Sequence, residues 1–170
     1  TIEMRFRGAL NDNMHGLYLA HNGTDRAIVT QCEATDARAI FPCFDEPDFK
    51  AKLTWRITTD PGLTVITNGA ARSTKRTGKH QRHEFHPTRA ISTYLAALTV
   101  GRFESTKTQR IAGVPTRILC GPGRLDQTAF AQTVTREVLP WFTEYFGQPY
   151  AYRKLDQVAV PGFDAGAMEN

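Results

Sequence analysis

The feature that most constrains this chain is a series of short alternating segments separated by turn-forming residues. Residues 52–58 alternate apolar and polar side chains, which is typical of a strand with one buried face. Pro61 and Gly62 interrupt that segment, and residues 63–67 predict the next strand. Short strands between turn signals predict antiparallel sheets or a sandwich. In this part of the sequence we predict strands at residues 17–20, 27–30, 52–58, 63–67, 81–86 and 92–100, with a turn at 21–24.

The pattern changes after residue 103, where one helical segment replaces the repeated strands. Residues 125–146 place apolar side chains at three- and four-residue steps, which predicts a helix. Pro140 lies inside this segment and predicts that the helix is kinked or split there. The apolar positions of the predicted helix are Phe130, Val134, Val138, Trp141, Phe142 and Tyr145.

Polar and apolar stretches on either side of this helix complete the predicted organisation. Residues 104–110 are polar and predict a linker, whereas residues 114–119 and 156–160 predict two further strands. We therefore expect a mainly β chain in two parts. An antiparallel, sandwich-like N-terminal domain covers residues 1–107, and the first strands and helix of an incomplete α/β domain cover residues 108–170.

Composition and charge argue against several classes of protein. Hydrophobic residues make up 41% of the chain, which is too many for a wholly disordered protein. No apolar run approaches the roughly 18 residues that would predict a transmembrane helix. The net charge is +4, but the basic residues in segment 72–79 have no aromatic neighbours on which bases could stack. We predict a solvated hairpin there and no nucleic-acid partner.

The cysteines and histidines do not form a metal-binding pattern. Three cysteines without CxxC spacing argue against a structural zinc site and favour a reducing compartment, so we expect a cytoplasmic location. His80, His83 and His86 cluster in sequence, but the last two are three residues apart in a predicted strand and point to opposite faces. The sequence therefore predicts no metal site in this chain.

The acidic run around Pro47 could hold a cation, but a structural role is the better interpretation. Asp45, Glu46 and Asp48 surround this proline, and acidic turns bounded by proline commonly cap local structure. We interpret Asp45 and Glu46, together with Arg38, as an ion pair or a cap.

Two longer motifs point to a family. The run from Thr30 to Pro47, TQCEATDARAIFPCFDEP, resembles a block in the N-terminal β domain of M1-family zinc aminopeptidases. The last five residues, GAMEN, resemble the exopeptidase signature of that family. Shorter segments match in the same order, namely residues 93–95, 113–115 and 146–150, so the resemblance covers essentially the whole chain. It implies that residues 108–170 begin a thermolysin-like catalytic domain.

The resemblance also implies a substrate-binding role for seven residues. An aminopeptidase must recognise a free α-ammonium group, and a fixed carboxylate can do so through a charge-assisted hydrogen bond. Glu169 would be that carboxylate, and Glu33 would be a second one. Gln31 would share a face with Glu33 on an extended segment and line the pocket for the first side chain. Gly166 and Ala167 would let the peptide backbone approach as an added strand, Met168 would pack, and Asn170 would hold the turn.

The catalytic half of such a site is not found in these residues. In the family, the zinc ligands (H-E-x-x-H and a later glutamate), the general base and a tyrosine that stabilises the transition state follow the GAMEN signature. We therefore expect an internal fragment of a zinc enzyme that acts on peptides with a free N-terminus. The fragment itself would carry no catalytic residue, bind no zinc and hydrolyse no peptide.

Three alternatives remain open. One is a bifunctional epoxide hydrolase of the same family, although such relatives tend to carry Gly in place of Ala167 and Gln in place of Glu33. Another is a non-catalytic scaffold that kept the β domain, although a scaffold has no need of two anchoring glutamates. The third is a nucleic-acid module on the basic hairpin, whose binding would weaken steeply with salt.

Overall fold

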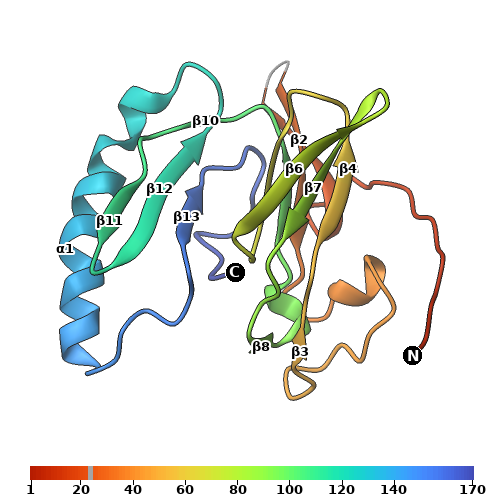
Figure 1. The fold of residues 1–170 in the computed structure, drawn as a ribbon, viewed down its shortest axis with the longest axis horizontal. Coiled ribbons are helices and arrows are strands. Elements are labelled where there is room, and N and C mark those ends of the chain that lie inside the picture. The colour runs from red at the N-terminus through yellow and green to blue at the C-terminus, as the bar shows by residue number, and fades with distance from the viewer. Residues whose placement is uncertain (23–24) are drawn as a thin grey trace.

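The computed structural model describes residues 1–22 and 25–170, and it has a β-rich half and a half built around one helix (Figure 1). The β-rich half holds the strands of the first hundred residues, and the C-terminus lies between the two halves (Figure 1). The predicted turn at 21–24 includes residues 23 and 24, which lie outside the described residues. The mainly β character predicted from the sequence is confirmed.

The largest sheet of the N-terminal half is antiparallel and has the order β1-β2-β9-β5. Its core cluster comes from the first two strands and consists of Tyr18, Ala20, Ala27 and Val29. The alternation of these residues places them on one face of the sheet, and their burial supplies its apolar contacts. The strands are β1 (Gly16–Asn22), β2 (Asp25–Gln31), β5 (Thr64–Thr67) and β9 (Leu98–Gly101).

The prediction of one continuous strand at residues 52–58 is wrong, because this segment forms two short strands that pair with different partners. The first part pairs with β8 and the second part pairs with β7. Between these two strands, the backbone N–H of Leu53 donates a hydrogen bond to the side chain of Thr88 (Oγ1, 2.9 Å) and not to the backbone of a neighbouring strand. The strands are β3 (Ala51–Lys52), β4 (Arg56–Thr59), β6 (Ala71–Thr77), β7 (His80–Phe85) and β8 (Ala90–Ile91); β4, β7 and β6 form one sheet.

The strand predicted at residues 92–100 begins later than expected. Its first part is a 3-10 turn, η2 (Thr93–Leu95), and β9 begins only at Leu98. The Ser92 hydroxyl donates to the carbonyl of Pro47 at 2.6 Å, and the Thr93 hydroxyl donates to Asp45 Oδ1 at 2.7 Å. These hydrogen bonds to a loop that is distant in sequence hold the segment in a turn. The apolar content of the segment could not predict them. A second short turn, η1 (Ala37–Ala39), precedes that loop.

The second sheet is mixed and has β12 at its centre. It contains β10 (Glu104–Ser105), β11 (Gln109–Ile111), β12 (Val114–Cys120) and β13 (Leu155–Val158), of which β13 alone pairs in parallel with β12. The predicted linker at 104–110 is therefore partly wrong, because it contains β10 and the start of β11. The domain boundary predicted after residue 107 falls in the loop between those strands and stays a prediction.

The helix predicted at 125–146 forms as the turn η3 (Leu125–Thr128) followed by α1 (Ala129–Tyr145). It runs through Pro140 without splitting. The predicted apolar positions are exposed in this chain, including Phe130 at 81% and Tyr145 at 68%, whereas Thr135 and Leu139 are buried. A hydrogen bond joins the helix to the second sheet: Gln157 Nε2 on β13 donates to Thr135 Oγ1 on α1 at 2.6 Å.

His83 predicts a pH dependence of stability. Its ring is buried in β7 and lies between the hydroxyls of Thr59 (3.3 Å) and Thr74 (3.4 Å). Burial lowers its pKa, so the unfolded chain binds a proton more readily than the folded chain. The free energy of unfolding should therefore decrease as the pH falls through about 6.5, the ordinary pKa of histidine. Urea unfolding between pH 5 and 8 measures this, and H83Q should remove the pH-dependent step. An equal slope in the two proteins would contradict the prediction.

Candidate functional site

The cavity next to the C-terminal segment is the candidate site. It has a volume of about 920 Å³ and lies between the largest N-terminal sheet and β13. Thr30 and Thr99 line it from one side, Gln157 lines it from the other, and Tyr150 and Tyr152 contribute aromatic surface. A cavity of this size can hold a short peptide segment.

The five residues of the GAMEN motif, 166–170, all line this cavity. A Cβ built on Gly166 would meet no atom within 4 Å, so open space faces this glycine. Glu169 is exposed, and its Oε1 accepts a hydrogen bond from the Tyr94 hydroxyl at 3.2 Å. Asn170 Nδ2 donates to the carbonyl of Leu95 at 3.3 Å. Both bonds tie the motif to the η2 turn of the N-terminal half.

Glu33 and Glu169 both act on the Tyr94 hydroxyl, Glu169 through a hydrogen bond and Glu33 through its negative charge. The pKa of Tyr94 is raised, first by desolvation, then by the hydrogen bond to Glu169 and by the negative charges of Glu169 and Glu33. Glu33 is exposed in the turn that follows β2, and its peptide bond to Ala34 is cis. Two carboxylates that are distant in sequence therefore act on one hydroxyl, and one of them, Glu169, lines the cavity.

The predicted relation between Gln31 and Glu33 is wrong. They were expected to share a face of one extended segment, but β2 ends at Gln31 and Glu33 lies in a turn. Gln31 is buried, and its Oε1 has no hydrogen-bond partner among the described residues. Neither side chain lines the 920 Å³ cavity, whereas the neighbouring Thr30 does. The alternation of side chains along a strand does not extend to Glu33, because the chain turns immediately after β2.

The η2 turn is anchored from two further places. Asp45, which is only 5% exposed, accepts hydrogen bonds from the backbone N–H of Arg38 (2.9 Å), from Arg38 Nε (3.1 Å) and from the Thr93 hydroxyl. Asn68 Nδ2 donates to the carbonyl of Leu95 at 2.7 Å, and its Oδ1 accepts from the N–H of Ala97 at 2.8 Å. An ion pair or a cap was predicted for Arg38, Asp45 and Glu46, and the structure contains the ion pair between Arg38 and Asp45.

Sequence reasoning missed the contribution of Tyr94 and Asn68 to this site. Tyr94 lay within a segment predicted as a strand, and Asn68 read as half of a turn signal. The signal that could have identified Tyr94 is its place in segment 93–95, which is one of the segments that resemble the family. The contacts themselves join residues more than twenty positions apart, as in the bond from Asn68 to Leu95.

A buried carboxylate lies on the other wall of the cavity. Asp156 accepts hydrogen bonds from Arg117 Nε at 2.7 Å and from Lys154 Nζ at 2.6 Å. Burial raises its pKa, but these bonds and charges outweigh that effect and lower the pKa overall. Arg117 and Asp156 are register partners in the parallel pair of β12 and β13, so the pair also fixes β13 in place.

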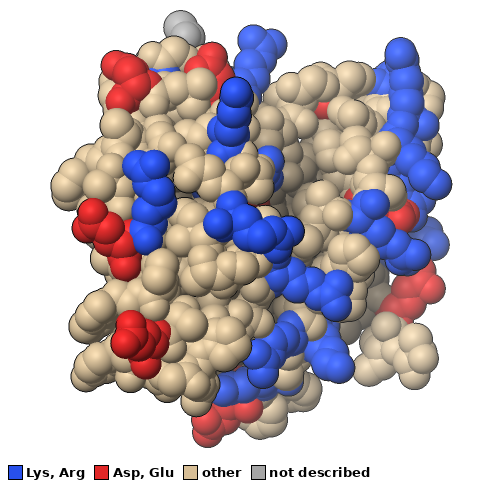
Figure 2. Space-filling view, turned by 60° about the vertical axis from the view of Figure 1, so that its left-hand side comes forward, with Lys and Arg blue, Asp and Glu red and all other residues tan. Residues whose placement is uncertain are grey.

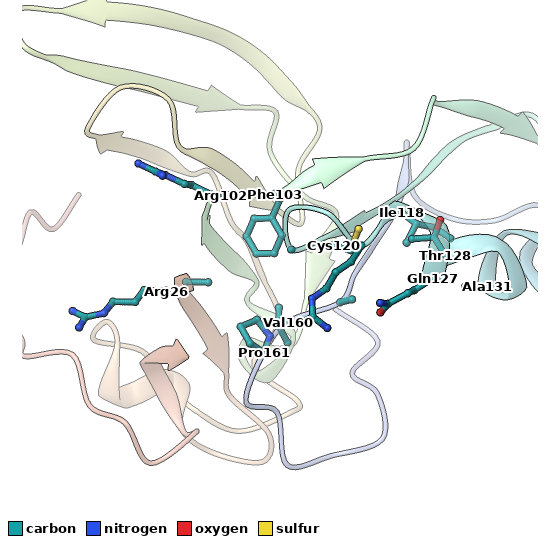
Figure 3. Close-up of a pocket in the computed structure, with 14 residues that line it drawn as sticks. Arg26, Arg102, Phe103, Ile118, Cys120, Gln127, Thr128, Ala131, Val160 and Pro161 are labelled. Carbon is teal, nitrogen blue, oxygen red and sulfur yellow. The ribbon is translucent and has the colours of Figure 1, made fainter. Parts of the chain in front are cut away.

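A smaller cavity of about 310 Å³ lies between the two halves near Phe103 (Figure 3). Arg26 and Arg102 line it, but their guanidinium groups point away from the Phe103 ring (Figure 3). Cys120 contributes a buried thiol whose pKa is raised by burial, which keeps it protonated and unreactive at neutral pH. None of the predicted site residues lines this cavity.

The described residues do not fit a metal ion. Within residues 1–22 and 25–170, no group of three or more His, Cys, Asp and Glu side chains is placed to hold one.

No helix in the part of the chain that the structure describes is long and apolar enough to span a membrane. Basic side chains spread over the face that includes the helical half, with acidic side chains mainly at its edges (Figure 2). The absence of a nucleic-acid partner stays a prediction.

Comparisons with known proteins place the chain in a family. The peptidase M1 N-terminal domain matches residues 1–95, and the peptidase family M1 domain matches residues 130–170. The chain therefore belongs to the M1 peptidase family. The first of these matches covers β2, which ends at Gln31, and the turn that carries Glu33; the second covers α1 from its second residue, β13 and the GAMEN motif.

Individual relatives agree with this assignment. Aminopeptidase M1 of Arabidopsis thaliana is 39% identical over 176 residues, which include all of this chain and 20% of the relative. Aminopeptidase 2, mitochondrial, of Saccharomyces cerevisiae is 37% identical, with 99% of this chain and 18% of the relative covered. The puromycin-sensitive aminopeptidase of Caenorhabditis elegans is 35% identical, with 99% and 19% covered. The chain spans about a fifth of the length of these relatives.

Proposed function

We propose that this chain supplies the part of an aminopeptidase that recognises the free N-terminus of a peptide. The observation that carries the proposal is the position of Glu169, which lines the 920 Å³ cavity and accepts a hydrogen bond from the Tyr94 hydroxyl. The names of the relatives, each an aminopeptidase, point in the same direction.

Two carboxylates suit an ammonium ligand for an electrostatic reason. A positively charged α-ammonium group offers three donors, which can satisfy the acceptors of both glutamates through charge-assisted hydrogen bonds. An internal peptide segment offers a neutral amide instead and leaves both carboxylates uncompensated when water is displaced. The pair therefore favours the first residue of a chain over internal positions.

The rest of the motif suits a peptide backbone. Gly166 faces open space and Ala167 is small, so an extended substrate can approach their backbone groups and pair with them. Met168 is half-buried, which fits a packing role, and Asn170 holds the end of the motif through Leu95. Gln31 is buried and does not line the cavity, so we propose that it supports the neighbouring Thr30, which does.

The M1 family is generally zinc-dependent, and we propose that the whole enzyme uses zinc. When bound, zinc polarises the scissile carbonyl and activates water. The described residues do not supply a ligand cluster for it. The role proposed for this chain is therefore limited to holding and orienting the amino terminus.

The test is hydrolysis by the natural protein that carries this sequence. We expect release of the first residue from Ala- and Leu-initiated peptides, and at least a 100-fold lower kcat/KM for the same peptides with an acetylated N-terminus. Acetylation removes the positive charge and leaves both glutamates unpaired, which costs about 3 kcal/mol or more. Cleavage of acetylated peptides at comparable rates would overturn the proposal. Binding without any cleavage would instead favour a scaffold.

A further inference from the structure

Tyr94 lies in the η2 turn of the N-terminal half, and its hydroxyl donates a hydrogen bond to Glu169 of the GAMEN motif. Among the described residues, no other side chain donates a hydrogen bond to this motif. We propose that Tyr94 is a positioning residue that fixes the Glu169 carboxylate in the orientation that binds the substrate ammonium group. This inference rests on the proposed function, and it adds a residue to the site that neither motif singled out.

The geometry leaves one oxygen of Glu169 free for a ligand. Tyr94 donates to Oε1 at 3.2 Å, whereas Oε2 has no hydrogen-bond partner among the described residues. The Glu169 side chain is exposed and lies in a segment without regular secondary structure, so little else holds it. A long, flexible carboxylate loses rotamer freedom when it binds an ammonium group, and a prior hydrogen bond reduces that loss.

Tyr94 can act in this way because its own backbone is firmly held. The hydroxyl of Ser92, just before the η2 turn, and the hydroxyl of Thr93, within it, both donate hydrogen bonds to the loop at residues 45–47, and Asn68 donates to the carbonyl of Leu95. The Tyr94 ring itself is half-buried. A rigid turn therefore presents one hydroxyl to a flexible glutamate, which is the arrangement that pre-organises a binding group.

A purely structural role for Tyr94 predicts a different result. If its hydrogen bond to Glu169 served only to join the two halves, its loss would lower the free energy of unfolding and leave the KM of the folded protein unchanged. A positioning role raises KM instead. A positioning role requires Glu169, so the effect should disappear when Glu169 is removed. A double-mutant cycle separates these two cases.

The first experiment is this cycle on the kinetics of the natural protein with an Ala-initiated peptide. We expect Y94F to raise KM about tenfold with kcat nearly unchanged, because the Glu169 carboxylate must then lose its rotamer freedom on binding, at equal cost in the bound ground state and the transition state. In the E169A background, Y94F should have less than a twofold effect. An equal rise in KM in both backgrounds would overturn the proposal.

The matched control is Y145F, which removes the same hydroxyl from an exposed tyrosine on α1 that does not line the cavity. We expect less than a twofold change in KM and in kcat. A change as large as that of Y94F would show that the kinetics report a general loss of tyrosine hydroxyls.

The second experiment does not depend on activity and uses the chain described here. The chain has five tyrosines, so ring-labelled tyrosine gives few NMR signals, and Y94F assigns the signal of Tyr94. Its pKa should lie above the ordinary value and should fall in E169Q, because the carboxylate charge is removed. No change in E169Q would overturn the contact itself. If the natural protein cleaves no peptide, the proposed function fails while this titration still decides whether Tyr94 holds Glu169.

Discussion

Replacing Glu169 by alanine should lower kcat/KM for a peptide with a free N-terminus by about 100-fold or more in the natural protein. The loss follows from removing one partner of a charge pair that becomes desolvated when the peptide binds, which costs about 2–5 kcal/mol. The negative charge of Glu33 acts on Tyr94, the residue that binds Glu169, so E33A should have an effect of the same sign. Steady-state kinetics with Ala- and Leu-initiated peptides measure both effects.

The control for these variants is E137A, which removes an exposed glutamate from α1. It should leave kcat/KM within about twofold of the starting protein. The discrimination between free and acetylated peptides should also shrink in E169A, because the carboxylate that favours the ammonium group is gone. If E169A kept both its rate and its discrimination, Glu169 would not be the anchor of the amino terminus.

The largest effect on stability is expected from Asp156. D156A should lower the free energy of unfolding by about 3 kcal/mol, because Arg117 and Lys154 lose a buried partner. Both basic side chains are partly shielded from water, with 35% and 18% of their surface exposed, so solvent replaces the lost bonds incompletely. Urea unfolding at pH 7 measures the difference, and D60A is the control because Asp60 is 81% exposed.

The sign of the pH dependence follows from the lowered pKa of Asp156. A carboxylate with a lower pKa in the folded state adds stability above its ordinary pKa, near 3.9. That contribution is lost as the pH falls through the folded-state pKa. The difference in unfolding free energy between the starting chain and D156A should therefore shrink at pH values below about 4. A difference that stayed constant from pH 7 to pH 3 would exclude an ionic role for Asp156.

Much of the fold could be predicted because it depends on local pattern. The strands that became β1, β2, β5, β7 and β12 were predicted from alternation and turn residues, and these features act within a few positions. The helix was predicted from its 3.6-residue period. The same pattern did not predict that Phe130 and Tyr145 would be exposed in this chain, because periodicity identifies an apolar face without saying what covers it.

The sequence by itself determined which residues carry the family motifs and which segments become strands, since both are properties of neighbouring positions. Only the tertiary structure decided where a strand changes partner, as at Leu53, and where a predicted strand becomes the η2 turn. It also decided that Glu169 accepts a hydrogen bond from the hydroxyl of Tyr94, which is 75 positions away in the sequence. Such contacts depend on how distant segments fold together, and burial and hydrogen bonding across the whole chain fix that arrangement.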